Sequence, residues 1–111
     1  MRNHSIKINR IVKCDGSSLW GDTKGLKVKV KSVKFEITPD SYCLVWVFHD
    51  KEWTIYTDRG FEEGISWLVS EKLGFPVKLM YTEQGMQEDG IVSMEATSKR
   101  LSRYFDEHAT A

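Results

Sequence analysis

The chain has 111 residues, of which 41% are hydrophobic, and its 16 Lys and Arg balance its 16 Asp and Glu. This length and composition indicate one globular domain with its own core and argue against a disordered chain. Two cysteines are too few for a disulfide scaffold, and no apolar run approaches the roughly 20 residues that span a bilayer.

The N-terminal segment has no apolar stretch typical of a signal peptide. Free thiols are typical of a reducing compartment, so we expect a cytoplasmic protein without a membrane segment. We also expect residues 1–111 to form a single domain in which residues 1–4 and 109–111 fray.

Strands are predicted over 5–13 and 26–37. The second strand alternates apolar residues with lysines, and its apolar phase stops at Val30 and resumes at Val33. Because one extra residue restores the buried face of a strand, this change predicts a β-bulge at Lys31–Ser32 and a single apolar face along the whole strand. The opposite face is basic and carries Lys27, Lys29, Lys31 and Lys34.

A near-continuous apolar run over 42–48 predicts a strand that is apolar on both faces. Such a strand has to be covered on both faces, so we expect it at the centre of the sheet. The connection 49–52 predicts a hairpin to a further strand over 53–57.

A helix is predicted over 60–73 by its 3.6-residue apolar periodicity. Gly74 fits the left-handed position that ends a helix, and Pro76 blocks its continuation. Gly64 inside the helix costs up to about 1 kcal/mol relative to Ala, and its predicted benefit is a close approach to the sheet. The remaining predicted elements are strands over 77–81 and 91–97 and a helix from Ser98.

Together these elements predict an α+β fold. We expect one curled antiparallel sheet of about six strands, with the element order β-β-β-β-α-β-β-α. The helix over 60–73 is expected to pack on one face of the sheet, and the short C-terminal helix is expected to close the other face.

No motif for a nucleophile, a cofactor or a metal ion is present, so we predict no catalytic, cofactor-binding or metal-binding residues. His49 beside Asp50 comes nearest to a catalytic pair, but adjacent residues of a strand point to opposite faces. We therefore predict that His49 is a surface histidine of a turn. Cys14 follows the first strand, and no Cys/His signature surrounds it.

Two surface features are candidates for binding. The lysine face of 26–37 is a candidate anion-binding or nucleic-acid-binding face, although the strand supplies no aromatic residues for base stacking and its lysines equally fit a face kept in solvent. Trp67 lies on the polar side of the predicted helix, where it either anchors a protein interface or is covered by another layer of the domain. The candidate protein interface comprises Trp67, Glu62, Glu63, Glu83, Glu88 and Asp89.

The net charge is distributed unevenly, with +5 over residues 1–51 and −5 over residues 52–111. The chain is small and has no catalytic, cofactor-binding or metal-binding motif. Together with this separation of charge, these features favour a non-enzymatic module that binds another protein by surface complementarity, in the manner of inhibitors, immunity proteins or antitoxins. The first alternative is a nucleic-acid-binding accessory protein that uses the lysine face. The second is a small-ligand-binding protein or an enzyme with an unrecognised pocket. The sequence leaves the oligomeric state open.

Overall fold

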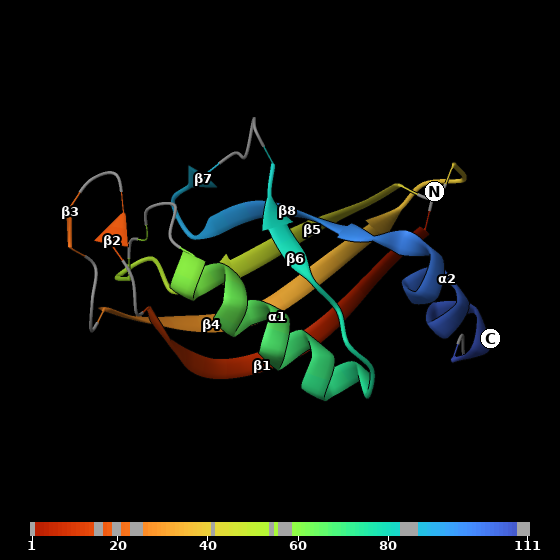
Figure 1. Cartoon of the computed structure of the whole chain (residues 1–111), viewed down its shortest axis with the longest axis horizontal. Coiled ribbons are helices and arrows are strands. Elements are labelled where there is room, and N and C mark those ends of the chain that lie inside the picture. The colour runs from red at the N-terminus through yellow and green to blue at the C-terminus, as the bar shows by residue number, and fades with distance from the viewer. Residues whose placement is uncertain are drawn as a thin grey trace.

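A computed structural model of the chain describes residues 2–14, 17–18, 21–22, 26–40, 42–53, 55, 59–82 and 87–108. The elements in chain order are β1 (Arg2–Cys14), β2 (Ser17–Ser18), β3 (Gly21–Asp22), β4 (Leu26–Ile37), β5 (Tyr42–His49), α1 (Arg59–Leu73), β6 (Leu79–Tyr81), β7 (Gln87–Glu88), β8 (Ile91–Thr97) and α2 (Ser98–Glu107) (Figure 1).

The long strands form one antiparallel sheet in the order β1-β4-β5-β8-β6, and β7 also pairs with β8. In the described part of the chain, this six-stranded sheet and two helices confirm the predicted α+β fold of a single domain. The short strands β2 and β3 pair with each other outside this sheet. Residues 2–4, for which fraying is predicted, pair with residues 35–37 as the start of β1, whereas 109–111 lie outside the described residues.

Strand β4 contains the predicted bulge. Its pairing with β5 shifts register between Val30 and Ser32. Strand β1 shifts its register in the same region and holds Asn9 at a φ of 51°, in the left-handed part of conformational space. Val28 and Phe35, which lie on either side of the bulge, are both fully buried in one core, as the predicted single apolar face requires.

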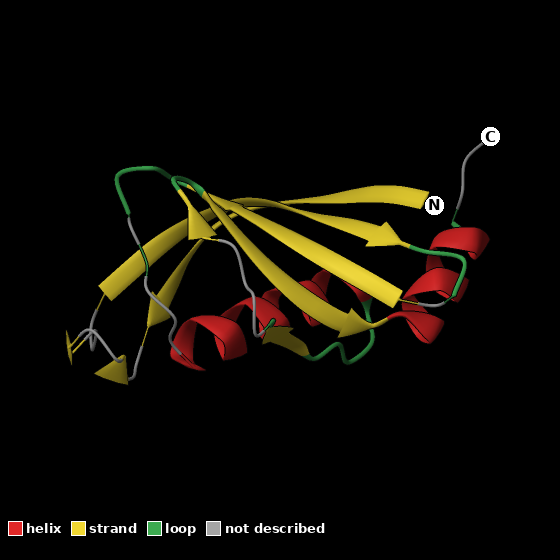
Figure 2. Ribbon diagram, turned by 90° about the horizontal axis from the view of Figure 1, so that it is seen from above, coloured by secondary structure: helices red, strands yellow, loops and turns green. Residues whose placement is uncertain are grey.

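The two described helices lie on one face of the sheet, and no described helix covers the opposite face (Figure 2). Helix α1 packs mainly on β1 and β6. Helix α2 extends the same layer, because the ring of Phe105 lies 5.5 Å from the buried ring of Phe35, centroid to centroid. The prediction that the C-terminal helix closes the second face is therefore wrong. We call the covered face the inner face and the open face the outer face.

Strand β5 alternates between these two faces. Its inner residues, which are all buried, are Cys43, Val45, Val47 and His49. Its outer residues, which are half-buried or exposed, are Tyr42, Leu44, Trp46 and Phe48. The position of β5 at the centre of the sheet is as predicted, but the expectation of cover on both faces is wrong, since the outer apolar residues face solvent.

The predicted strand over 53–57 is not found at its two described residues, Trp53 and Ile55, and the rest of it lies outside the described residues. Strand β5 pairs with β4 on one side and with β8 on the other. Neither edge of β5 is therefore open to a hairpin partner. The sixth strand of the sheet is β7 instead.

Helix α1 approaches the sheet closely at Gly64, as predicted. A Cβ atom on Gly64 would lie 2.4 Å from Cγ1 of Val12 on β1, so a glycine is needed at this crossing. The helix ends at Leu73, and Gly74 adopts a φ of 84° and donates its N–H to the carbonyl of Ser70 at 2.9 Å. Neither described helix is long and apolar enough to cross a membrane.

Two serines of α1 hold the segment before β6 against the helix. The N–H of Val77 donates to Oγ of Ser70 at 2.7 Å, and the N–H of Leu79 donates to Oγ of Ser66 at 2.9 Å. The serine hydroxyls thus satisfy backbone groups that do not bond to β8. They also account for a strand that begins at Leu79, two residues later than predicted.

Candidate functional site

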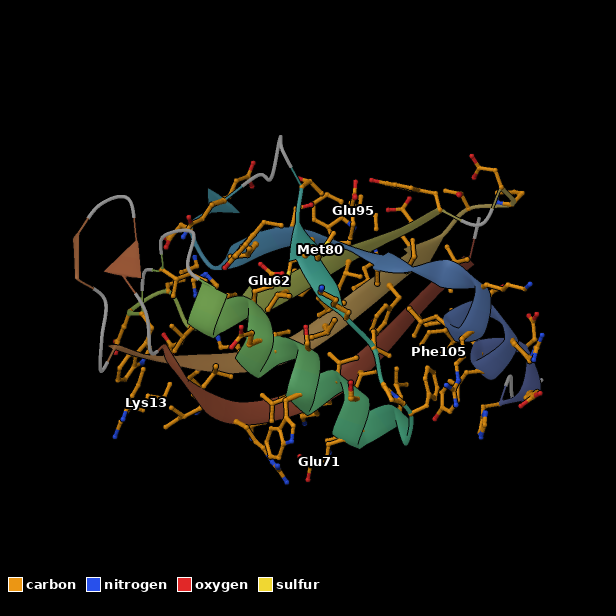
Figure 3. The ribbon with its side chains drawn as sticks, in the orientation of Figure 1. Lys13, Glu62, Glu71, Met80, Glu95 and Phe105 are labelled. Carbon is orange, nitrogen blue, oxygen red and sulfur yellow. The ribbon has the colours of Figure 1, made fainter. Side chains whose placement is uncertain are left out.

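The outer face of the sheet carries an apolar row along its central strand. We define this row as Tyr42, Leu44, Trp46 and Phe48 of β5. On β8, Ile91 pairs with Phe48. On β6, Met80 (labelled in Figure 3) pairs with Glu95, which pairs with Leu44, so Met80 shares the outer face. Tyr42 is 45% exposed and Met80 is 49% exposed, so apolar surface on this face contacts solvent directly.

The predicted lysine face belongs to the same outer face. Lys34 on β4 pairs directly with Trp46, and Lys7 on β1 pairs with Ser32. Of the four predicted lysines, Lys29 and Lys34 are half-buried, and Lys27 and Lys31 are exposed. Aromatic residues are absent from the lysine strand itself, but the inference that the face lacks them is wrong, because β5 places the apolar row next to the lysines.

Two carboxylates stand on either side of the apolar row and hold its polar atoms. Nε1 of Trp46 donates a hydrogen bond to Oε2 of Glu36 on β4 at 3.4 Å. The hydroxyl of Tyr42 donates to Oε1 of Glu95 on β8. This hydrogen bond to Glu95 raises the pKa of Tyr42 above its ordinary value of 10.0, so the hydroxyl stays protonated and continues to donate at neutral pH. The two bonds orient aromatic rings on an open surface.

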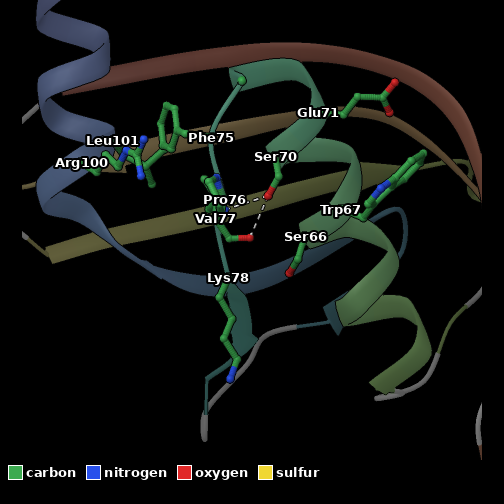
Figure 4. A pocket seen from close by; sticks show the side chains of 11 residues that line it. Ser66, Trp67, Ser70, Glu71, Phe75, Pro76, Val77, Lys78, Arg100 and Leu101 are labelled. Atoms are coloured by element: carbon green, nitrogen blue, oxygen red, sulfur yellow. Dashed lines mark hydrogen bonds between the residues drawn. The ribbon is translucent and has the colours of Figure 1, made fainter.

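A second surface is a groove of about 810 Å³ between α1, the connection 74–78 and α2 (Figure 4). Trp67 lines its α1 side and is 63% exposed. This exposure argues against the alternative in which another layer covers Trp67, since the described part of the chain leaves most of the ring open. Arg100 and Leu101 of α2 line the opposite side.

Two charged residues that line this groove, Glu71 and Arg100, contact other groups of the chain, and Lys78 is exposed at its rim. Glu71 accepts a hydrogen bond from Arg10 of β1 at 3.0 Å. The guanidinium of Arg100 lies 4.6 Å from the ring centroid of Phe75. The hydroxyls of the two lining serines bond to the segment before β6. The groove therefore offers apolar walls rather than the convergent polar groups of a small-ligand site.

Trp67→Ala is expected to lower the free energy of unfolding by less than about 1 kcal/mol, because a mostly exposed side chain gives up little buried area. Urea denaturation followed by circular dichroism measures this change. The control is Phe61→Ala on the same helix, where a fully buried ring is expected to cost about 3–5 kcal/mol. A loss for Trp67→Ala as large as that for the control would place the indole in the core.

The acidic residues of the predicted protein interface do not gather on one surface. Glu63 is exposed on α1, four residues before the exposed tryptophan, whereas Glu62 is half-buried. Glu88 and Asp89 are exposed at the β7–β8 turn, which belongs to the sheet rather than to α1. Glu83 lies outside the described residues.

Two side chains with nucleophilic or acid–base chemistry, those of Cys43 and His49, are buried. Burial raises the pKa of the Cys43 thiol to about 12, so it is not a thiolate at neutral pH. His49 is 4% exposed, with Nδ1 2.9 Å from the carbonyl oxygen of Asp50. The prediction of a surface histidine is wrong, because β5 extends to His49 and directs it to the inner face. Among the described residues, no group of three or more His, Cys, Asp or Glu is placed to hold a metal ion.

No family model, curated protein or solved structure matches the chain. The functional conclusion therefore depends on the two surfaces. Of these, the outer face combines exposed apolar side chains with lysines at defined register positions, whereas Glu71 and Arg100 of the groove are engaged by other residues of the chain. The outer face is the stronger candidate for binding.

Proposed function

We propose that the protein is a non-enzymatic binding module of the cytoplasm that binds single-stranded nucleic acid on the outer face of its sheet. The observation that supports this proposal is the pairing of Lys34 with Trp46, which places lysines beside the aromatic rings of the apolar row on an uncovered face. Such combinations bind single strands because bases stack on aromatic rings while cationic side chains neutralise the phosphates.

The spacing of the aromatic rings fits base stacking. Trp46 and Phe48 are two residues apart on β5, so their Cα atoms lie about 6.8 Å apart along the strand and their side chains point to the same face. This spacing leaves room for one base on each ring. Both side chains are half-buried, which restricts their movement before binding and lowers the entropy cost of ordering them.

The lysines lie to one side of the apolar row. The strands on this side, β4 and β1, carry Lys7, Lys29, Lys31 and Lys34. A single strand whose bases stack on β5 therefore places its phosphates over β4 and β1. Each phosphate that a lysine neutralises releases a counterion, so binding is expected to weaken steeply as salt is added.

A second candidate is a protein-binding module of the inhibitor, immunity or antitoxin class that docks its partner on the same face. The aliphatic residues of the face favour this candidate, since Leu44, Met80 and Ile91 offer apolar contact without a ring for stacking. The lysines favour nucleic acid, because charged residues are depleted from the centre of protein interfaces. We therefore place protein binding second.

The proposal predicts tight binding of a labelled, unstructured DNA of about 12 nucleotides at about 50 mM salt and much weaker binding at about 200 mM salt. Trp46→Ala is expected to lose about 1–3 kcal/mol of binding free energy, because it removes one stacking platform. Lys34→Gln is expected to lower the slope of log Kd against log salt by about one phosphate contact. Fluorescence anisotropy measures both effects.

Lys99→Gln on α2 is the matched control, since Lys99 is exposed and belongs to the helix layer rather than the outer face. It should leave the Kd and the slope unchanged. Equal losses in the two lysine variants, or no binding at low salt, would contradict the proposal. A photo-crosslinker in place of Phe48 separates the two candidates in cells, because an adduct that resists nuclease but not protease identifies a protein partner.

A further inference from the structure

We propose that the carboxylates on either side of the apolar row, Glu36 and Glu95, make the outer face select bases that carry an exocyclic amino group, so that cytosine is bound in preference to thymine. This inference rests on the proposed function, and it names the class of base that the face reads.

The carboxylates lie at the edges of the stacking surface. Oε2 of Glu36 is 3.4 Å from Nε1 of Trp46, which is at the edge of the indole ring. A base stacked on this ring therefore has the carboxylate of Glu36 close to its own edge. Glu95 lies on the other side of the row, where it pairs with Leu44 and accepts a hydrogen bond from Tyr42.

Both carboxylates retain acceptor capacity for a base. An ionised carboxylate has about four lone-pair positions and no proton to donate. Among the described residues, Glu36 and Glu95 each accept one side-chain hydrogen bond, from Trp46 and Tyr42 respectively. The remaining positions can accept from a ligand but cannot donate to one.

Acceptors of this kind discriminate between the two pyrimidines of DNA. Cytosine presents its N4 amino group as a donor, whereas thymine presents O4, an acceptor, at the same position. A carboxylate binds the first and repels the second. Both bases have similar rings for stacking, so the difference between them isolates the hydrogen bond at the base edge.

The carboxylates also distinguish a face that reads bases from a face that binds only the phosphate backbone. Two negative charges beside the stacking rings weaken any purely electrostatic interaction with phosphates. They strengthen binding only where a donor of the ligand reaches them, as the amino group of a stacked base does. The lysines and the carboxylates of the outer face therefore contact different parts of the same ligand.

The test compares labelled oligonucleotides of cytosine alone and of thymine alone, with the same length, label and salt, by fluorescence anisotropy. The wild-type protein is expected to bind the cytosine strand at least about tenfold more tightly. In Glu36→Gln this ratio should fall toward one, because an amide donates to thymine as readily as it accepts from cytosine. Glu107→Gln, the same change at an exposed position on α2, should keep the wild-type ratio.

Each result has a distinct meaning. Equal affinity for the two strands in the wild-type protein would overturn the inference and leave the proposed function intact. Failure to bind either strand would overturn both. A cytosine preference that persists in a protein carrying both Glu36→Gln and Glu95→Gln would also overturn the inference, because the preference would then have another source. Circular dichroism of each variant confirms that the fold is retained.

Discussion

Val45→Asp is expected to unfold the domain. Val45 is fully buried on the inner face of β5, where it pairs with Phe35 on β4 and with Met94 on β8. A carboxylate among these apolar neighbours is neither hydrated nor paired with a cation. The free energy of unfolding should therefore fall by at least about 4 kcal/mol, which is much of the stability of a small domain. The measurement is urea denaturation followed by circular dichroism, and the expected result is the loss of a cooperative transition.

Lysine substitutions at neighbouring positions provide the control. Val45→Lys should be as damaging as Val45→Asp. Leu44→Lys should cost less than about 1 kcal/mol, because Leu44 is half-buried on the outer face. Its register neighbours are Glu36 and Glu95, which favour a cation. Unfolding by Leu44→Lys would show that the outer face is covered, and a cooperatively folding Val45→Asp would show that the inner face is not the core.

Features that depend on local sequence were predictable. The phase change between Val30 and Val33 indicated the bulge, since a strand can restore its buried face only by adding a residue. Gly74 followed by an apolar residue and a proline indicated the helix end, because a left-handed residue is needed there. In both cases the backbone geometry is decided within a few residues, so distant contacts do not alter it.

The open face of the sheet could not be predicted from the apolar run 42–48. Apolar residues on the second side of a strand occur when another layer covers them, and they occur equally when they form a binding surface. The sequence of β5 is the same in both cases. The position of α2 makes the difference, because its Phe105 packs on Phe35 of the inner face. Helix α2 therefore does not cover the outer face.

The candidate site was missed because it depends on the pairing of strands. Lys34 and Trp46 are 12 residues apart in the chain but adjacent in the sheet. The aromatic residues of the face belong to the neighbouring strand, so the sequence of the lysine strand alone does not contain them. Only residues 38–41 separate the two predicted strands, a spacing typical of a hairpin. Alignment of the outward-facing residues of the two strands therefore offered a signal that would have placed lysines beside aromatics.

Gly64→Ala is expected to destabilise the domain by about 1–3 kcal/mol, even though alanine favours a helix by up to about 1 kcal/mol over glycine. The new Cβ would lie 2.4 Å from Cγ1 of Val12, and Val12 is buried and too stiff to move aside. The helix must then shift away from β1. Urea denaturation measures the loss in free energy of unfolding. A loss of this size would show that α1 and the sheet are as close as in the structure.

A double-mutant cycle with Val12→Ala separates this clash from other effects of the substitution. Val12→Ala alone should cost about 1–3 kcal/mol for the lost methyl groups. It also removes Cγ1, and the next atom, Cβ of Val12, lies 3.8 Å from the new methyl group, an ordinary contact distance. The free energy of unfolding that the double variant loses should therefore be smaller than the sum of the two single losses by at least about 1 kcal/mol. Additive losses would mean that α1 crosses β1 at a greater distance, and that the inner layer is packed less tightly than the structure requires.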